Sequence, residues 1–259
     1  MGGGGKSAAL AHLAAERAAT GERVVVGTTT HMCRRELDDV GSLTLHTDPA
    51  VLLRRLKDII ADGGIGAVGS RSDHAGKIVG VAPVTIDALW RGDVADCVLV
   101  EADGCRGRSL KSFGPHEPQV PSVTTTIVLL AGADVLGQPL REEHVQRAAP
   151  LAARIGVPLG SVMTPVLVAA ALRDQSRRLR LGWPAARLVV LVNKVEGDAV
   201  LAAATATAAL LRAPLEDAAG PAPSVAPCGG AMTTAVPDRV VLASLEARRF
   251  SWSAHGAAA

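Results

Sequence analysis

Four consecutive glycines, Gly2 to Gly5, stand directly before Lys6 and Ser7 at the start of the chain. Because glycine has no Cβ, consecutive backbone N–H groups in such a run can turn toward one anion, such as a polyphosphate. In phosphate-binding loops of this kind the lysine reaches the β- and γ-phosphates, and the following hydroxyl binds Mg²⁺. We therefore predict that ATP or GTP, with Mg²⁺, is bound by Gly2, Gly3, Gly4, Gly5, Lys6 and Ser7. We expect the Lys6 side chain to be exposed without ligand.

The segment after this loop is rich in alanine and predicts a helix from Ser7 to Thr20 that stops at Gly21. The positive end of its dipole would face the phosphates. The alternative interpretation is a flexible glycine tail before an ordinary helix. The full pattern G-x-x-x-x-G-K-[ST] also needs a glycine before Met1, and the hydrophobic strand that usually leads into the loop is missing. We expect either that the start codon was assigned too late or that the chain lacks its central strand.

Polar residues follow two apolar runs that predict buried strands. Thr28, Thr29, Thr30 and His31 follow the run at 23–27, and we expect Thr30 and His31 to sense a γ-phosphate. Glu101 ends the run at 96–101 and Asp103 follows it, and together they resemble a Walker B element, which holds Mg²⁺ directly or through water. Ligands bind at the carboxyl ends of strands in open α/β sheets, so catalytic roles are predicted for Lys6, Thr30, His31, Glu101 and Asp103. The alternatives are a β-branched strand end with a surface histidine, and ordinary acidic strand ends.

A third strand, predicted over 187–193, ends in Asn193-Lys194-Val195-Glu196. This resembles the N-K-x-D element by which GTPases read guanine, with Asn193, Lys194 and Glu196 as nucleotide-binding residues. Glutamate is one methylene longer than aspartate, so we predict weak discrimination between GTP and ATP. A solvated charge pair at a strand end is the alternative.

The remaining pattern predicts an α/β fold with a doubly wound, mostly parallel sheet like that of P-loop NTPases, apparently lacking its first strand. Helices are expected over 48–61, 83–90, 142–154 and 198–211, and further strands over 124–130 and, in a small sub-lobe, 66–69 and 77–81. A Pro/Ala-rich connection is expected over 214–227. We expect one domain over residues 1–250, a sub-lobe over about 62–92, and a frayed tail over 251–259.

Composition narrows the functional class. The 259 residues are 48% hydrophobic, which supplies a substantial core. The net charge is only +2 and aromatic residues make up 2%, so neither a nucleic-acid surface nor a membrane partner is predicted. The four cysteines contain no C-x-x-C pair, so no zinc site or disulfide framework is indicated. No signal peptide is visible, and we expect a cytoplasmic protein.

Taken in order, several motifs make the sequence similar to the YqeC family. They are Gly2–Ser7, Thr28–His31, Gly76-Lys77, Val100–Gly104, Leu110-Lys111, His116–Pro121, Gly132–Leu140 and His144–Arg147. The resemblance covers roughly residues 2–200, with departures at Cys105, where a serine or alanine is expected, and at Gln146, where the family has histidine.

The YqeC family is described as accessory proteins of selenium-dependent molybdenum hydroxylases. The resemblance implies a nucleotide-binding protein for maturation of such a hydroxylase, with the enzyme or its molybdopterin cofactor as partner. Lys111, His116 and Glu117 would then line the region that faces the substrate or client. Two alternatives stay open: a small-molecule kinase or selenium-transfer enzyme, and a non-hydrolysing module gated by nucleotide.

Overall fold

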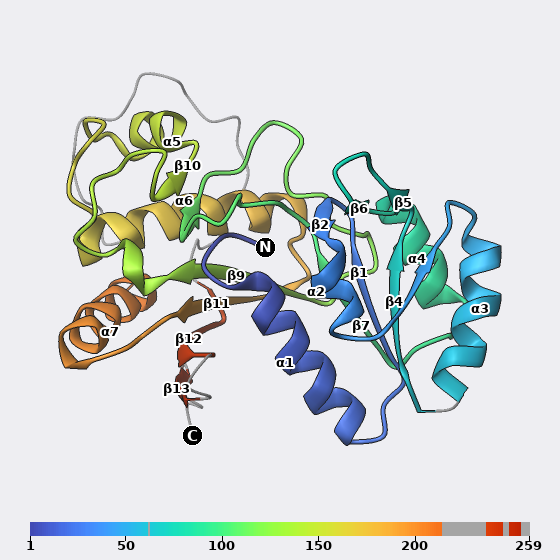
Figure 1. Ribbon diagram of the computed structural model, residues 1–259. Coiled ribbons are helices and arrows are strands. Elements are labelled where there is room, and N and C mark those ends of the chain that lie inside the picture. The colour runs from blue at the N-terminus through green and yellow to red at the C-terminus, as the bar shows by residue number, and fades with distance from the viewer. Residues whose placement is uncertain (62, 214–236, 246–248, 255–259) are drawn as a thin grey trace.

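The computed structural model describes the chain except residues 62, 214–236, 246–248 and 255–259 (Figure 1). The helices are α1 (Lys6–Ala19), α2 (Arg34–Asp38), α3 (Pro49–Ala61), α4 (Pro83–Arg91), α5 (Ala148–Ile155), α6 (Pro165–Gly182) and α7 (Asp198–Arg212), with a 3-10 turn at Ala133–Val135. The strands are β1 (Val24–Thr28), β2 (His31–Cys33), β3 (Ser42–Leu45), β4 (Ile65–Gly69), β5 (Arg71–Ser72), β6 (Lys77–Val79), β7 (Cys97–Glu101), β8 (Leu110–Lys111), β9 (Thr126–Gly132), β10 (Val145–Gln146), β11 (Arg187–Asn193), β12 (Arg239–Ser244) and β13 (Arg249–Ala254).

Two four-stranded sheets carry most of the fold. The first has the order β3-β4-β1-β7 and is parallel throughout. The second has the order β13-β12-β11-β9 and is parallel except for β13, which pairs antiparallel with β12. Strands covered by helices on both faces are continuously apolar, as the Val-Val-Val run of β1 is. The predicted α/β class with mostly parallel strands is confirmed.

Helix α1 lies where the two sheets meet. Leu10 and Ala14 pack on Val24 and Val26 of β1, in the core of the first sheet. On the same helix, Ala9 packs with Leu130 of β9, in the second sheet. Figure 1 shows the N-terminus between β9 and the strands of the first sheet, with α1 running away from that point. The glycine run is thereby held between the two sheets.

The small sheets differ from the expected sub-lobe. β4 pairs with β1 and β3 in the first large sheet, because its buried Ala67 and Val68 belong to that core. Only β5 and β6 form a small sheet outside it, together with β2. The assignment of 66–69 to a sub-lobe was therefore wrong, while α4 forms as predicted.

Three other expectations about elements need correction. Residues 142–147 are not helical, because Arg147 has φ 60° and Val145–Gln146 pair with β8, so α5 begins only at Ala148. Helix α6 was not predicted, although Thr164 caps it and Pro165 occupies its first turn, where proline is tolerated. Residues 251–254 belong to β13 instead of a frayed tail. The connection at 214–227 lies outside the described residues.

Within the described residues, none of the helices is long and apolar enough to cross a membrane.

Candidate functional site

The glycine run is packed backbone against backbone, which explains its composition. Gly2 and Gly4 have φ 89° and 79°, a region that favours glycine. A Cβ on Gly2 would lie 2.1 Å from the carbonyl oxygen of Leu130, and one on Gly4 would lie 2.2 Å from the nitrogen of Gly132. The loop therefore rests directly on the end of β9, and larger residues at these positions would push it away.

The hydrogen bonds of the loop divide its N–H groups into two sets. Gly3 donates to the Leu130 carbonyl at 2.9 Å and Gly4 donates to the Arg108 carbonyl at 3.1 Å. The N–H groups of Gly5, Lys6 and Ser7, at the start of α1, donate to no group in the described part of the chain. Unpaired N–H groups at a helix N-terminus, together with its dipole, favour an anion.

Lys6 is folded back into the protein. It is only 6% exposed. Its ammonium donates to the Gly2 carbonyl at 3.1 Å and lies 3.7 Å from Glu101 and 3.8 Å from Asp103. Burial acts to lower the pKa of Lys6, but Glu101, Asp103 and Cys105 together outweigh it and raise the pKa, so the ammonium stays charged. The expectation that Lys6 is exposed without ligand was wrong, since the two buried carboxylates hold it.

Glu101, at the end of β7, has one carboxylate oxygen that makes no hydrogen bond to the described residues. The residue is 7% exposed, and its Oε2 has no hydrogen-bond partner among the described residues. Burial raises the pKa of Glu101, and the nearby Lys6 ammonium offsets only part of that effect. A buried carboxylate oxygen without a partner is unfavourable, and a cation would satisfy it.

Glu36 is a further acidic residue that the sequence analysis did not identify. The Ser7 hydroxyl donates to its Oε1 at 2.7 Å. Its Oε2 accepts from the Cys33 N–H at 3.1 Å, which fixes the side chain at the start of α2. Glu36 is also close enough to raise the pKa of Glu101. Its only sequence signal was the spacing from Cys33, three residues before it, and cysteine is a poor marker of a helix N-cap.

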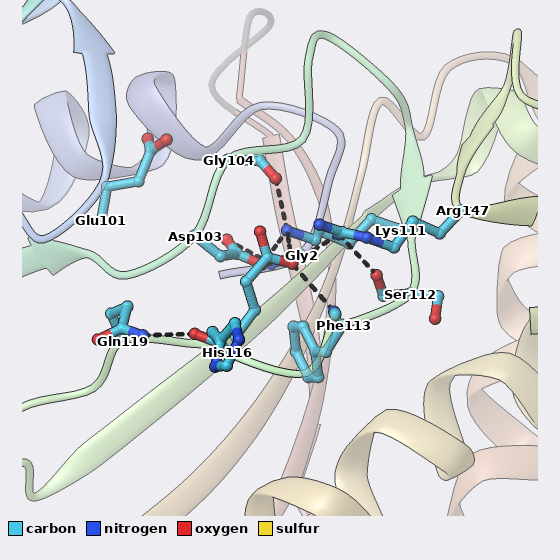
Figure 2. Close-up of polar contacts among 12 residues, drawn as sticks. Gly2, Glu101, Asp103, Gly104, Lys111, Ser112, Phe113, His116, Gln119 and Arg147 are labelled. Atoms are coloured by element: carbon cyan, nitrogen blue, oxygen red, sulfur yellow. Dashed lines mark hydrogen bonds and ion pairs between the residues drawn. The ribbon is translucent and has the colours of Figure 1, made fainter. Parts of the chain in front are cut away.

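Asp103 and Lys111 belong to a chain of alternating charges (Figure 2). Both oxygens of Asp103 accept from the Gly2 N–H, at 3.0 and 3.1 Å, and one lies 3.3 Å from the Lys111 ammonium. Lys111 is also 2.9 Å from Glu117, which in turn is 2.6 Å from Arg147. Figure 2 shows Glu101 apart from this group. The carboxylate of Asp103 therefore already has partners in Gly2 of the loop and in Lys111, whereas the carboxylate of Glu101 is paired with neither of these two residues.

The three residues expected to face a substrate or client therefore separate. Lys111 is 0% exposed, so it does not line a surface as predicted. Glu117 is half-buried; burial acts to raise its pKa, but Lys111, the Gly114 N–H and Arg147 outweigh burial and lower it. His116 is exposed, and its backbone carbonyl accepts a hydrogen bond from the Gln119 amide. A client role for His116 stays a prediction.

Thr30 and His31 come directly after β1, whose end is paired with the end of β7 that carries Glu101. The Thr30 N–H donates to the Thr28 hydroxyl at 3.1 Å, and His31 is exposed on β2. Thr28 is paired with Glu101 in the register of β1 and β7, which brings the two strand ends together. The γ-phosphate role of Thr30 and His31 stays a prediction.

At the end of β11, Asn193 supports the loop. It is 5% exposed, its Nδ2 donates to the Gly4 carbonyl at 2.8 Å, and its Oδ1 accepts from the Leu245 N–H at 3.0 Å. Lys194 lies 2.7 Å from Asp134, and Glu196 accepts from the Ser244 hydroxyl at 3.1 Å. Of these contacts, only that of Asn193 joins the third motif to the loop, and base recognition there stays a prediction.

The loop, the β7 end and the network around Lys111 all lie within the region that a family comparison covers. The YqeC family model, described as "YqeC protein", matches residues 1–149, more than half of the chain. The chain belongs to the YqeC family. The match ends before β11, so the Asn193 motif lies outside it, although the sequence resemblance was expected to reach about residue 200.

A relative from Escherichia coli (strain K12), described as "Uncharacterized protein YqeC", supports this membership. It is 34% identical over 148 residues, which are 57% of this chain and 56% of the relative. The similarity thus spans little more than half the length of each protein. No solved structure matches the chain.

Proposed function

We propose that this YqeC-family chain binds a nucleoside triphosphate and Mg²⁺ between its two sheets. The observation that carries the proposal is the start of α1, where the unpaired N–H groups of Gly5, Lys6 and Ser7 lie beside a buried lysine and an unpartnered carboxylate oxygen. The N–H groups suit phosphate oxygens, the lysine suits their charge, and Glu101 suits a divalent cation.

The residues present would hold Mg²⁺ only with help from the nucleotide. No group of three or more His, Cys, Asp and Glu side chains in the described ranges is arranged to hold a metal ion. Mg²⁺, however, commonly uses one or two carboxylates together with phosphate oxygens and water. We assign Glu101 and the Ser7 hydroxyl to this role, with Glu36 orienting Ser7 at 2.7 Å. Asp103 instead orients the loop through the Gly2 N–H.

Nucleotide binding would require Lys6 to change partners. Its ammonium is held by Glu101, Asp103 and the Gly2 carbonyl, and a polyphosphate would compete for the same charge. Cation binding to Glu101 would weaken one of these contacts as the phosphates arrive. Binding is thereby coupled to a local rearrangement at the junction of the two sheets, which suits an accessory protein whose contact with a client depends on nucleotide.

The experiment is a calorimetric titration of the whole chain with Mg-ATP and with Mg-GTP, each repeated with excess EDTA. We expect saturable binding that weakens when Mg²⁺ is removed. Glu101→Gln should lose the Mg²⁺ dependence, while the matched surface change Glu16→Gln on α1 should not. No binding of either nucleotide by the folded chain would overturn the proposal.

The client follows from the family resemblance: a selenium-dependent molybdenum hydroxylase or its molybdopterin cofactor. A measurement of nucleotide hydrolysis with and without the client distinguishes this proposal from the kinase or selenium-transfer enzyme and from the non-hydrolysing module. Multiple turnover without a client would favour a kinase or selenium-transfer enzyme. Turnover only with the purified hydroxylase, or nucleotide-dependent binding to it without turnover, would favour an accessory protein or gated module.

The base preference is a separate part of the proposal. Glu196 is exposed and already accepts from Ser244, so we expect GTP and ATP to compete almost equally for one fluorescent analogue. Glu196→Asp should shift the preference toward GTP. A strong GTP preference in the parent chain that disappears in Glu196→Ala would show that Glu196 reads guanine.

A further inference from the structure

A cleft of about 500 Å³ separates the two large sheets. Its walls include Val98 and Val100 of β7, Val128 of β9 and Leu13 of α1. In the described part of the chain, β7 pairs only with β1, and β9 pairs with β11 and, through Leu130, with Gly2. One water takes up about 30 Å³ of liquid volume, so this space is too large to be explained by a few ordered waters.

The apolar strand β7 is less buried than its position warrants. All five residues of β1, its neighbour, are buried. On β7, in contrast, Cys97, Val98, Leu99 and Val100 are each only half-buried. A continuously apolar parallel strand is normally an interior strand with partners on both sides and helices on both faces. The sequence of β7 is therefore that of an interior strand, although it lies at an edge.

The first residues of the chain already pair with β9. The Met1 amino group donates to the Val128 carbonyl at 3.0 Å, Leu130 N–H donates to the Met1 carbonyl at 2.9 Å, and Gly3 N–H donates to the Leu130 carbonyl at 2.9 Å. The pairing is parallel. Burial lowers the pKa of the Met1 amino group, as expected for an amine held in this cleft. Continued backward beyond Met1, the same ladder would run between β7 and β9.

We propose that an apolar β-strand leading directly into Met1 occupies this cleft, between β7 and β9. The strand would run parallel to both neighbours and join the two sheets into one. Its length would match β7, which has five residues. Both of its faces would be apolar, because α1 covers one of them and interior parallel strands are apolar on both. A glycine directly before Met1 would also complete the spacing G-x-x-x-x-G-K-S.

The backbone shows which N–H groups such a strand would satisfy. Cys97 N–H donates to Arg23 and Glu101 accepts from Thr29, so these residues of β7 face β1. Neighbouring residues of a parallel strand face opposite partners, so the N–H groups of Val98 and Val100 face the cleft. The Val128 backbone faces it from β9, as its bond from Met1 shows.

The test extends the chain before Met1 by a five-residue Val/Ile segment and a glycine, in comparison with a Gly/Ser extension of equal length. We expect hydrogen exchange at Val98, Val100 and Val128 to slow at least about tenfold with the apolar extension only, with a higher Tm. A third extension, with proline in the middle of the apolar segment, should lose most of this protection because proline cannot donate to the ladder.

If the extended chain fails to fold, the free peptide of the same sequence is titrated into the unextended chain, where it should protect the same three N–H groups. Equal exchange with apolar and Gly/Ser extensions, or no protection by the peptide, would overturn the proposal. Protection of these groups in an unextended chain that sediments as a dimer would also overturn it, because a second copy would then fill the cleft. None of these readouts uses nucleotide, so the outcome is separate from that of the proposed function.

Discussion

Lys6 has a structural role in addition to the ligand-binding role proposed for it. Its ammonium is the only cation within ion-pair distance of Glu101 in the described residues, and it shares Asp103 with Lys111. A buried charge without a partner is expensive, so the lysine compensates the acidic groups until a ligand supplies other charges. The residue expected to act on phosphate thus also stabilises the site that would receive it.

Lys6→Ala should therefore unfold more easily as well as bind nucleotide less tightly. Removing one partner of a buried ion pair typically costs about 3–5 kcal/mol. The exposed Lys57→Ala on α3 is the matched control and should leave both properties nearly unchanged. Urea unfolding and calorimetric titration measure the two effects. A Lys6→Ala variant as stable as the Lys57→Ala variant would contradict the ion-pair role.

Glu101→Gln should alter the pH dependence of stability. Burial raises the pKa of Glu101 in the folded state above its ordinary value of 4.5, so the folded protein binds this proton more tightly than the unfolded chain does. Stability therefore falls as pH rises from 4.5 through the raised pKa, and glutamine removes that loss. Thermal melts from pH 4 to pH 8 should show the Tm of the variant, relative to the parent, rising with pH. A constant difference across this range would count against a strained carboxylate.

At the scale of elements, the junction of the glycine loop with α1 is set by close backbone contacts. Gly4 packs on Gly132 at the end of β9, while the Gly4 carbonyl is held by Asn193 at the end of β11. The helix start is thus positioned by the ends of two strands that lie far from it in sequence. This arrangement places the N–H groups of α1 at the carboxyl edge of the sheets.

Gly4→Ala tests this packing. Gly21→Ala, at a glycine with a similar φ angle, is its control. Gly4 has φ 79° and Gly21 has φ 84°, but a Cβ on Gly21 would meet nothing within 4 Å. Alanine at Gly21 should cost roughly 1–2 kcal/mol for the left-handed conformation alone. Alanine at Gly4 should cost clearly more in urea unfolding, and it should weaken Mg-ATP binding. Equal losses at the two positions would show that the contact with Gly132 is easily relieved.

At the scale of the whole molecule, the charge chain around Lys111 connects distant parts of the fold. Asp103 follows β7 of the first sheet, Lys111 lies on β8, and Arg147 directly precedes α5. Asp103 also accepts a hydrogen bond from the Gly2 N–H. A displacement of the glycine loop would therefore disturb the ion pairs that link Asp103 through Lys111 to Glu117.

Lys111→Met should strongly destabilise the protein, because it leaves Asp103 and Glu117 facing each other with one cation fewer. The expected loss is about 3–5 kcal/mol, as for other buried ion pairs. Lys77→Met, at an exposed position of β6, is the matched control and should change stability little. Urea unfolding with tryptophan fluorescence measures both. A loss no greater than that of Lys77→Met would mean that the network relaxes around the missing charge.

Local patterns in the sequence were sufficient for much of the framework. The alanine-rich helix from Ser7, the Val-rich strand predicted over 23–27 and the strand at 187–193 were recognisable because burial and helix termination depend on nearby residues. The position of Glu101 at the end of an apolar strand was recognisable in the same way. Where a short pattern competed with pairing to a distant strand, as at 142–147, it was misleading.

Other features arise only when distant segments meet. Nothing near Lys6 indicates that Glu101 and Asp103 will bury its ammonium, and nothing near Ser7 indicates that Glu36 will accept its hydrogen bond. The residues next to Lys111 in the sequence are those of an ordinary surface lysine, and only the folded chain brings Asp103 and Glu117 around it. Sequence pattern reflects propensity and burial, which are local, whereas the pairing of charges depends on which strand ends the sheets bring together. The cleft between β7 and β9 belongs to this second class, because an unfilled strand position exists only between two assembled sheets.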